Sequence, residues 1–212
     1  MKLIKKFVFF LSLTVLASLI SCKSTKTESG ETTIFTTDWI ESSYSDTDKL
    51  GHFFTTPEIG QFSMIEGEFK KSGGYEHSAF GFVFGYTADE KGWLSDYMRF
   101  EITTAGNYAA FACKGNTYID LVEANDKNTA YMYESSAINS GYDSVNKLKI
   151  QKIDDKKYDL FINGTKVTTI TVPDGFGNSD GVMAFFSVGT KNQEQFPSNP
   201  VKVTYRITDS LN

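Results

Sequence analysis

The residues best suited to hold a ligand lie between Trp93 and Tyr108. Tyr97, Arg99 and Glu101 alternate along one run and should share one face of a strand, because successive side chains of a strand point to opposite sides. Aromatic rings stack on apolar ring faces, and Arg and Glu hydrogen-bond polar groups. We therefore expect a binding patch of Trp93, Tyr97, Arg99, Glu101 and Tyr108. The alternative is that the tyrosines cover sheet edges, with their hydroxyls in water.

Further tyrosines occur on the polar side of runs or in loops, and the same two interpretations apply to them. They are Tyr118, Tyr131, Tyr133 and Tyr142.

No grouping of side chains predicts catalysis. Glu66 and Glu68 should share a strand face, but no third carboxylate follows at a useful offset, so we interpret them as solvent-facing charges on an outer strand. Asp120 and Glu123 are three apart and should lie on opposite faces. Cys113 lies in an apolar run and is expected to be a small core residue rather than a nucleophile. We expect a protein that is not an enzyme.

Metal ligands are not predicted either. His52 and His77 are the only histidines, and neither has the spacing to Cys, Asp or Glu that a zinc site requires. Calcium is left open because loop acids can bind it without a compact motif, although solvated charge is the default interpretation. The loop groups of suitable type are Asp89, Glu90, Asn125, Asp126, Asp174, Asn178 and Asp180.

Short β-type runs separated by turns predict an all-β domain, since no eleven-residue window after the first segment has helical periodicity. We expect two antiparallel sheets packed face to face, a sandwich or jelly roll, with a closed barrel as the alternative. The runs are 50–54, 61–70, 79–87, 96–103, 107–113, 118–122, 146–170, 181–188 and 201–207.

Alternation assigns faces to several of these runs. Met98, Phe100 and Ile102 should face the core opposite Tyr97, Arg99 and Glu101, giving a half-buried strand. The run 181–188 is apolar on both faces and should be a central strand. In the run 79–87, Gly81, Val83 and Gly85 should lie on one face. Four aromatic residues should lie on the other face, namely Phe80, Phe82, Phe84 and Tyr86.

The stretch 146–170 predicts a three-stranded meander. Asn163-Gly164 is a strong hairpin signal because both residue types tolerate positive φ, and we expect this turn to set the register. Leu148 and Ile150 should face the core, with lysines on the solvated side. This stretch is therefore interpreted as scaffold.

The first residues predict an export signal, with three lysines before an apolar run, 7–20, that is too short to span a bilayer. Leu19-Ile20-Ser21-Cys22 resembles the lipobox of bacterial lipoproteins, which implies lipidation of Cys22 and anchoring to a membrane. The alternative is a plain secretory signal. We expect a signal peptide at 1–21, a lipidated flexible tether at 22–37 and one β-sandwich domain at 38–212, located in the cell envelope, with the outer membrane or cell surface favoured.

Charge and cysteine content restrict the partners. Removal of the three leader lysines takes the formal charge from −5 to −8, which disfavours nucleic acid as a partner. With Cys22 lipidated, Cys113 has no partner, so the domain must be stabilised by its core.

Four segments look like successive strands of the concanavalin A-like, laminin G-like jelly rolls: 97–111, 145–167, 181–189 and 201–209. The resemblance implies a module that binds glycan or another extracellular polymer. The alternatives are a structural or protein-interaction lipoprotein, adhesin-like, and a glycosidase-related enzyme. The family's glucanases carry Glu-x-Asp-x-x-Glu on one strand, a pattern that this sequence lacks.

Overall fold

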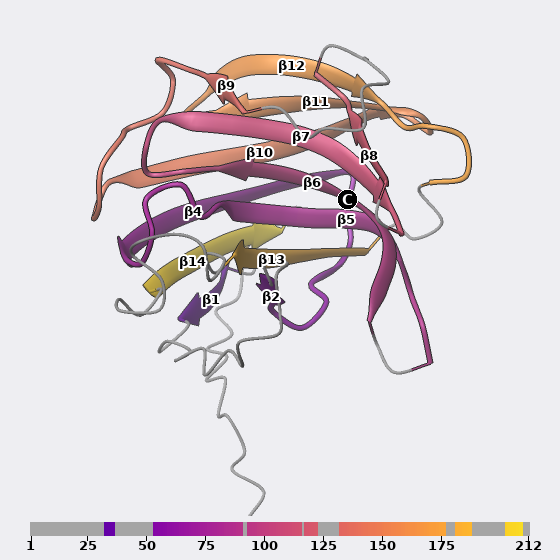
Figure 1. Ribbon diagram of the computed structural model, residues 1–212, viewed down its shortest axis with the longest axis horizontal. Helices are drawn as coiled ribbons and strands as arrows, with labels where there is room; N and C mark the ends of the chain where they lie inside the picture. Colours follow the sequence, from indigo (N-terminus) through magenta and orange to yellow (C-terminus); the bar gives the residue numbers. More distant parts are fainter. Residues whose placement is uncertain are drawn as a thin grey trace, which may run out of the picture.

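The computed structural model is a sandwich of two antiparallel sheets (Figure 1), which confirms the predicted fold class. It describes residues 32–36, 53–90, 93–115, 117–122, 132–176, 181–187 and 202–209. The six-stranded sheet has the order β1-β14-β4-β10-β11-β12, and the eight-stranded sheet has the order β2-β13-β5-β6-β7-β8, with β3 paired to β13 and β9 to β7.

The described residues form strands and turns but no helix. They therefore contain no helix that is long and apolar enough to cross a membrane. The bounds of the strands are β1 (Thr32–Thr36), β2 (Phe53–Thr55), β3 (Gly60–Gln61), β4 (Met64–Gly73), β5 (Phe80–Ala88), β6 (Leu94–Ile102), β7 (Asn107–Lys114), β8 (Thr117–Asp120), β9 (Tyr133–Glu134), β10 (Val145–Asp154), β11 (Lys157–Ile162), β12 (Thr165–Thr171), β13 (Gly181–Ser187) and β14 (Lys202–Asp209).

Strand β1 begins earlier than the expected start of the domain. The sequence places its residues in the tether, but they pair with β14 from Thr32 opposite Thr208 to Thr36 opposite Thr204. The physical reason is composition, because a Thr-, Ile- and Phe-rich run suits an edge strand. Cys22 and the rest of the predicted leader and tether lie outside the described residues.

The predicted meander is confirmed as β10-β11-β12, with a β10–β11 register that pairs Leu148 with Ile162 and Ile150 with Leu160. Asn163 and Gly164 form the second turn with φ of 49° and 83°. Leu148 and Ile150 are fully buried in the core between the sheets, as expected.

The main core is built from inner-face side chains of both sheets. Phe69 of β4 meets Phe82 of β5 edge to face, with ring centroids 5.0 Å apart, so these rings join the two sheets. Strand β13 lies between β5 and β2 and buries both its faces, as predicted for the run 181–188.

One predicted face assignment is wrong. Phe80, Phe82 and Phe84 face the main core, but Tyr86 belongs to a second hydrophobic cluster on the outer face of the eight-stranded sheet. The pairing of β5 with β6 shifts register between Phe84 and Thr87, and Gly85 has φ 58°. A bulge of this kind inserts one residue and re-aims the next side chain to the other face.

Candidate functional site

The outer face of the eight-stranded sheet contains three of the predicted binding residues. Tyr97, Arg99 and Glu101 share this face on β6, while Met98, Phe100 and Ile102 lie in the main core. Glu101 pairs with Gly81 on one side and Ala109 on the other, and these small neighbours leave it room to lie along the sheet.

The Arg99 guanidinium is enclosed by aromatic rings from three other strands. Its central carbon lies 4.0 Å from the ring centroid of Phe185, 4.9 Å from that of Phe53 and 5.2 Å from that of Phe111. Stacking of this kind suits a planar, weakly hydrated cation. Arg99 Nη2 also donates to Ser187 Oγ at 2.9 Å.

Arg99 and Glu101 form a buried ion pair, with Nη2 and Oε2 2.5 Å apart and side chains 10% and 7% exposed. Burial raises the pKa of the Glu101 carboxyl, and the Arg99 charge opposes this rise. Arg99 Nε is buried without a hydrogen-bond partner. The sequence predicts that β6 is half-buried, but both of its faces are buried at these residues. Arg99 and Glu101 are therefore part of the packed outer cluster and do not form an open surface for a ligand.

Tyr97 extends the same cluster toward the sheet edge. Burial is the main cause that raises the pKa of its hydroxyl, followed by a hydrogen bond with Cys113. Tyr118, on β8, lies beyond Cys113 in the pairing register and packs on Phe111 with ring centroids 5.6 Å apart. Cys113 is a buried free thiol in this cluster, as predicted for a core residue.

Trp93 is the exposed member of the predicted patch, with 67% of its surface accessible. It directly precedes β6 in the connection between β5 and β6, two strands that run side by side in the eight-stranded sheet (Figure 1). Its backbone is fixed by Asp89, whose Oδ1 accepts from Trp93 N at 2.9 Å and whose N donates to Trp93 O at 2.9 Å. The indole is therefore exposed to solvent on a residue whose backbone N and O are both bonded to Asp89.

Tyr108 does not join this patch. It lies in the main core, on the other face of the sheet, with its ring centroid 5.7 Å from that of Tyr133. The cause is parity, since Tyr108 pairs directly with Ile102, which faces the core. The structure thus brings Tyr97, Arg99 and Glu101 together, leaves Trp93 exposed beyond them and separates Tyr108.

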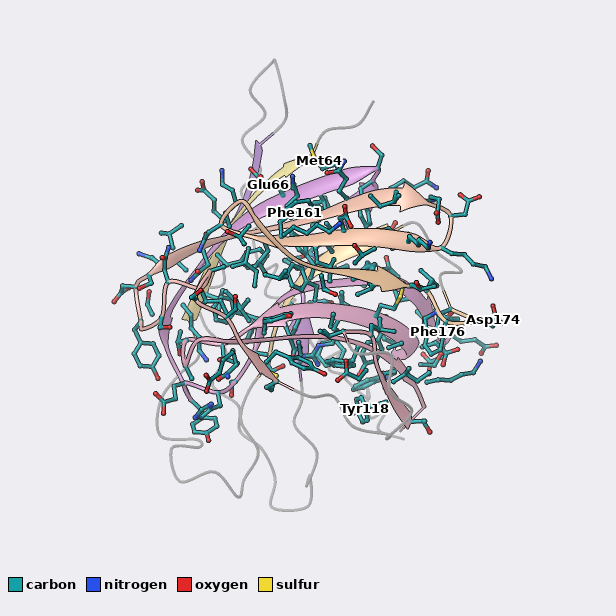
Figure 2. The ribbon with its side chains drawn as sticks, turned by 90° about the horizontal axis from the view of Figure 1, so that it is seen from above. Met64, Glu66, Tyr118, Phe161, Asp174 and Phe176 are labelled. Atoms are coloured by element: carbon teal, nitrogen blue, oxygen red, sulfur yellow. The ribbon has the colours of Figure 1, made fainter. Side chains whose placement is uncertain are left out.

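Glu66 and Glu68 lie on the outer face of the six-stranded sheet, as expected for solvent-facing charges, but β4 lies between β14 and β10 and is not the outer strand that we expected. Lys147 Nζ is 3.1 Å from Glu66 and 3.8 Å from Glu68. Figure 2 shows Glu66 and Phe161 on one side of the molecule and Tyr118 on the opposite side. These carboxylates are therefore far from the aromatic cluster around Arg99.

The loop acids that left calcium open do not gather where the structure describes them. Among the described residues no three His, Cys, Asp or Glu side chains form a group that could hold a metal ion. Asp174 is paired with Lys156 at 2.9 Å, and Asp120 is buried and accepts from Tyr133 at 2.7 Å. Several candidates lie outside the described residues: His52, Glu123, Asn125, Asp126, Tyr131, Asn178 and Asp180.

Lys71 was not singled out from the sequence. It is 1% exposed, and its Nζ donates to the carbonyl oxygens of Tyr75 at 2.5 Å and Ser78 at 2.7 Å. Desolvation lowers its pKa from 10.5 to about 7. The signal was present, because Lys71 continues the core-facing series Ile65, Gly67 and Phe69 of β4.

No protein-family model matches the chain, and no curated protein is significantly similar to it in sequence. Among solved structures, the chain is similar to a native glycosidic hydrolase at 13% identity and a TM-score of 0.49, covering 86% of this chain and 80% of that one.

It is also similar to the carbohydrate binding module CBM66 from Bacillus subtilis, at 12% identity and a TM-score of 0.46 over 84% and 95% of the two chains. It is similar as well to sheep galectin-11 in complex with glycerol, at 8% identity and a TM-score of 0.41, over 74% of this chain and 96% of the galectin chain. At these values the similarity concerns the β-sandwich architecture alone.

Proposed function

We propose that this protein is a lipid-anchored binding module of the bacterial cell envelope whose β-sandwich binds a glycan or another extracellular polymer. The lipobox-like sequence that ends at Cys22 supports the anchor. The surface chemistry of the sandwich supports the binding.

The observation that carries the binding proposal is the exposed Trp93 indole, whose backbone is held by Asp89. A flat indole at the surface suits stacking on the apolar face of a sugar ring, and its N–H can donate to a polar group beside that face. Trp93 directly precedes β6, the strand on which Tyr97, Arg99 and Glu101 are buried.

Binding of the full-length protein in detergent to a panel of immobilised polysaccharides tests this proposal. Trp93→Ala should weaken binding by about tenfold, equivalent to about 1.4 kcal/mol. Ile153→Ala is the matched control. Ile153 is 51% exposed on β10, so this substitution also removes an exposed apolar side chain. Equal binding by wild type and Trp93→Ala would reject this role for Trp93.

The anchor has a separate test. Cys22→Ala should move the protein from the membrane fraction to the soluble fraction, with Cys113→Ala as the cysteine control. Unchanged membrane retention of Cys22→Ala would contradict lipidation at this residue.

A second candidate function is a structural or protein-interaction lipoprotein of the envelope. The exposed Trp93 also suits a protein partner, because tryptophan is enriched among residues that dominate protein interfaces. Absence of binding to any polysaccharide, together with Trp93-dependent capture of one envelope or host protein, would favour this alternative.

We propose no catalytic activity for the domain. Glu66 and Glu68 are paired with Lys147 on the solvated face, away from the aromatic cluster. Release of reducing sugar that is lost in Glu66→Gln and Glu68→Gln would overturn this view.

A further inference from the structure

The connection between β4 and β5 is held by side chains at almost every carbonyl group. Tyr142 donates to Gly74 O, Lys71 to Tyr75 O, Thr104 to Glu76 O at 3.0 Å, and Lys71 again to Ser78 O. The donors come from β4, from the β6–β7 turn and from the segment before β10. The preceding strand and two distant parts of the chain therefore hold this one loop, residues 74–78.

The fixed loop presents polar and aromatic side chains to solvent. The side chains of Glu76 and His77 are each 52% exposed, and His77 Nε2 lies 3.6 Å from Glu76 Oε1. The His77 ring is 5.3 Å from that of Tyr75. Tyr142 is 44% exposed, and burial, then the Glu76 charge, raises the pKa of its hydroxyl. The His77 ring and the Tyr142 hydroxyl therefore both lie near the Glu76 carboxylate, with Tyr75 beside His77.

One of the groups that hold the loop is a buried lysine, Lys71, and burial of a charged group opposes folding. Loops fixed on a rigid scaffold are where binding residues concentrate, because preorganised side chains lose little freedom when a ligand binds.

The position of the loop also suits an external ligand. Thr32, the first residue of β1, is level with Glu66 of β4, whereas the loop follows Gly73 at the opposite end of that strand. Seven residues of strand separate the two levels by roughly 20 Å. Strand β5 runs from the loop toward the Trp93 hairpin, so the loop and Trp93 lie at opposite ends of the sandwich. A tether that enters at β1 leaves the loop facing away from the anchor.

We propose that Tyr75, Glu76, His77 and Tyr142 form a contact site for a neutral sugar ring at the end of the sandwich away from the anchor. The inference rests on the proposed glycan-binding function and adds a site that is separate from Trp93. The aromatic rings stack on the apolar sugar face, and Glu76 accepts hydrogen bonds from sugar hydroxyls. The Glu76 charge disfavours acidic sugars.

Pull-down of the full-length protein in detergent on mixed-linkage β-glucan, xylan and galactomannan, with polygalacturonate as the acidic comparison, tests the site. His77→Ala and Tyr142→Ala should each weaken binding to the bound neutral polysaccharide by roughly tenfold. Tyr142→Phe keeps the ring and removes its bond to Gly74 O, so it should retain most of the affinity. Ile153→Ala is the exposed apolar control, and thermal melts verify folding.

Full affinity in both His77→Ala and Tyr142→Ala, with loss in Trp93→Ala, would overturn this site and leave the proposed function standing. If Tyr142→Ala does not fold, His77→Ala decides, because its side chain is half exposed. Preference for polygalacturonate over the neutral polysaccharides would overturn the assignment of ligand class. Failure of the wild-type protein to bind any of the four would reject both proposals.

Discussion

Asn163 Nδ2 donates a hydrogen bond to Asn146 Oδ1 at 2.9 Å, and this contact joins the β11–β12 turn to the second residue of β10. The same Nδ2 donates to Ala137 O at 2.8 Å, and Asn163 Oδ1 accepts from Lys147 N at 2.8 Å. Asn163 therefore connects the meander to the segment before β10, in addition to adopting the positive φ of its turn.

Asn163→Asp tests that connection. An aspartate tolerates the turn conformation but turns a carboxylate oxygen toward two acceptors, Ala137 O and Asn146 Oδ1, so we expect a loss of roughly 2 kcal/mol in the free energy of unfolding. Asp154→Asn is the control, because its Oδ1 acceptor for Lys156 N is retained. Equal stability of the two variants in urea denaturation would contradict the role of Asn163.

Gly81 and Gly67 should respond differently to alanine. A Cβ at Gly81 would lie 2.2 Å from the Phe100 carbonyl oxygen, which belongs to the neighbouring strand and has no way to rotate aside. A Cβ at Gly67 would meet ring atoms of Phe69 and Phe82 at 2.7 and 2.8 Å, and rings can shift. We expect Gly67→Ala to lower the free energy of unfolding by about 1–3 kcal/mol. Gly81→Ala should lower it by more or prevent folding. Denaturant midpoints in the reverse order would contradict this reasoning.

Lys71 predicts a specific pH dependence of stability. Between its folded pKa of about 7 and its unfolded value of 10.5, the unfolded chain holds a proton that the folded chain has released. The free energy of unfolding of the wild type should therefore rise relative to Lys71→Met as pH increases through this range, by up to a few kcal/mol.

Below pH 7 this difference should stay at its least favourable value for the wild type. Lys70→Met is the matched control, because Lys70 is the exposed neighbour on β4. Parallel pH profiles for wild type and Lys71→Met would show that Lys71 is solvated in solution.

The Arg99–Glu101 pair predicts a strong double-mutant effect. Arg99→Met leaves the Glu101 carboxyl buried without its counter-charge, so the free energy of unfolding should fall by about 3–5 kcal/mol at pH 7. Arg99→Met combined with Glu101→Leu should recover most of that loss.

The pH profile of Glu101→Gln adds an independent measurement. The folded pKa of Glu101 is raised, so its stabilising contribution is complete below the unfolded value of 4.5 and decreases as pH rises toward the folded value. Wild type should therefore lose stability relative to Glu101→Gln above that pH. Lys147→Met, which removes an exposed ion pair, should change stability by less than about 1 kcal/mol.

Much of the fold could be predicted because alternation and turn chemistry are local. The meander, the central position of β13 and the core faces of β4, β6 and β10 follow from residues a few positions apart. Tyr86 was assigned to the wrong face because a single bulge at Gly85 reverses parity, and no periodicity in the sequence marks that insertion.

The surroundings of the expected binding residues could not be predicted from the sequence, because their burial depends on strands far apart in the chain. Arg99 is enclosed by Phe53 and Phe185, which are brought to it only when β2 and β13 join the sheet. Tyr108 was grouped with Tyr97 by composition, although the β6–β7 register places it in the core. Long-range register is what the sequence of one strand does not contain.

The position of β14 has a consequence for how the chain folds. This strand, which is the last along the sequence, lies between β1 and β4 in the six-stranded sheet. Until residues 202–209 pair as β14, one edge of β4 is unpaired and β1 has no neighbouring strand among the described ones. The six-stranded sheet can therefore form completely only after this last described strand has joined it. A chain that crosses a membrane unfolded would remain open during passage and complete its sandwich only on the far side.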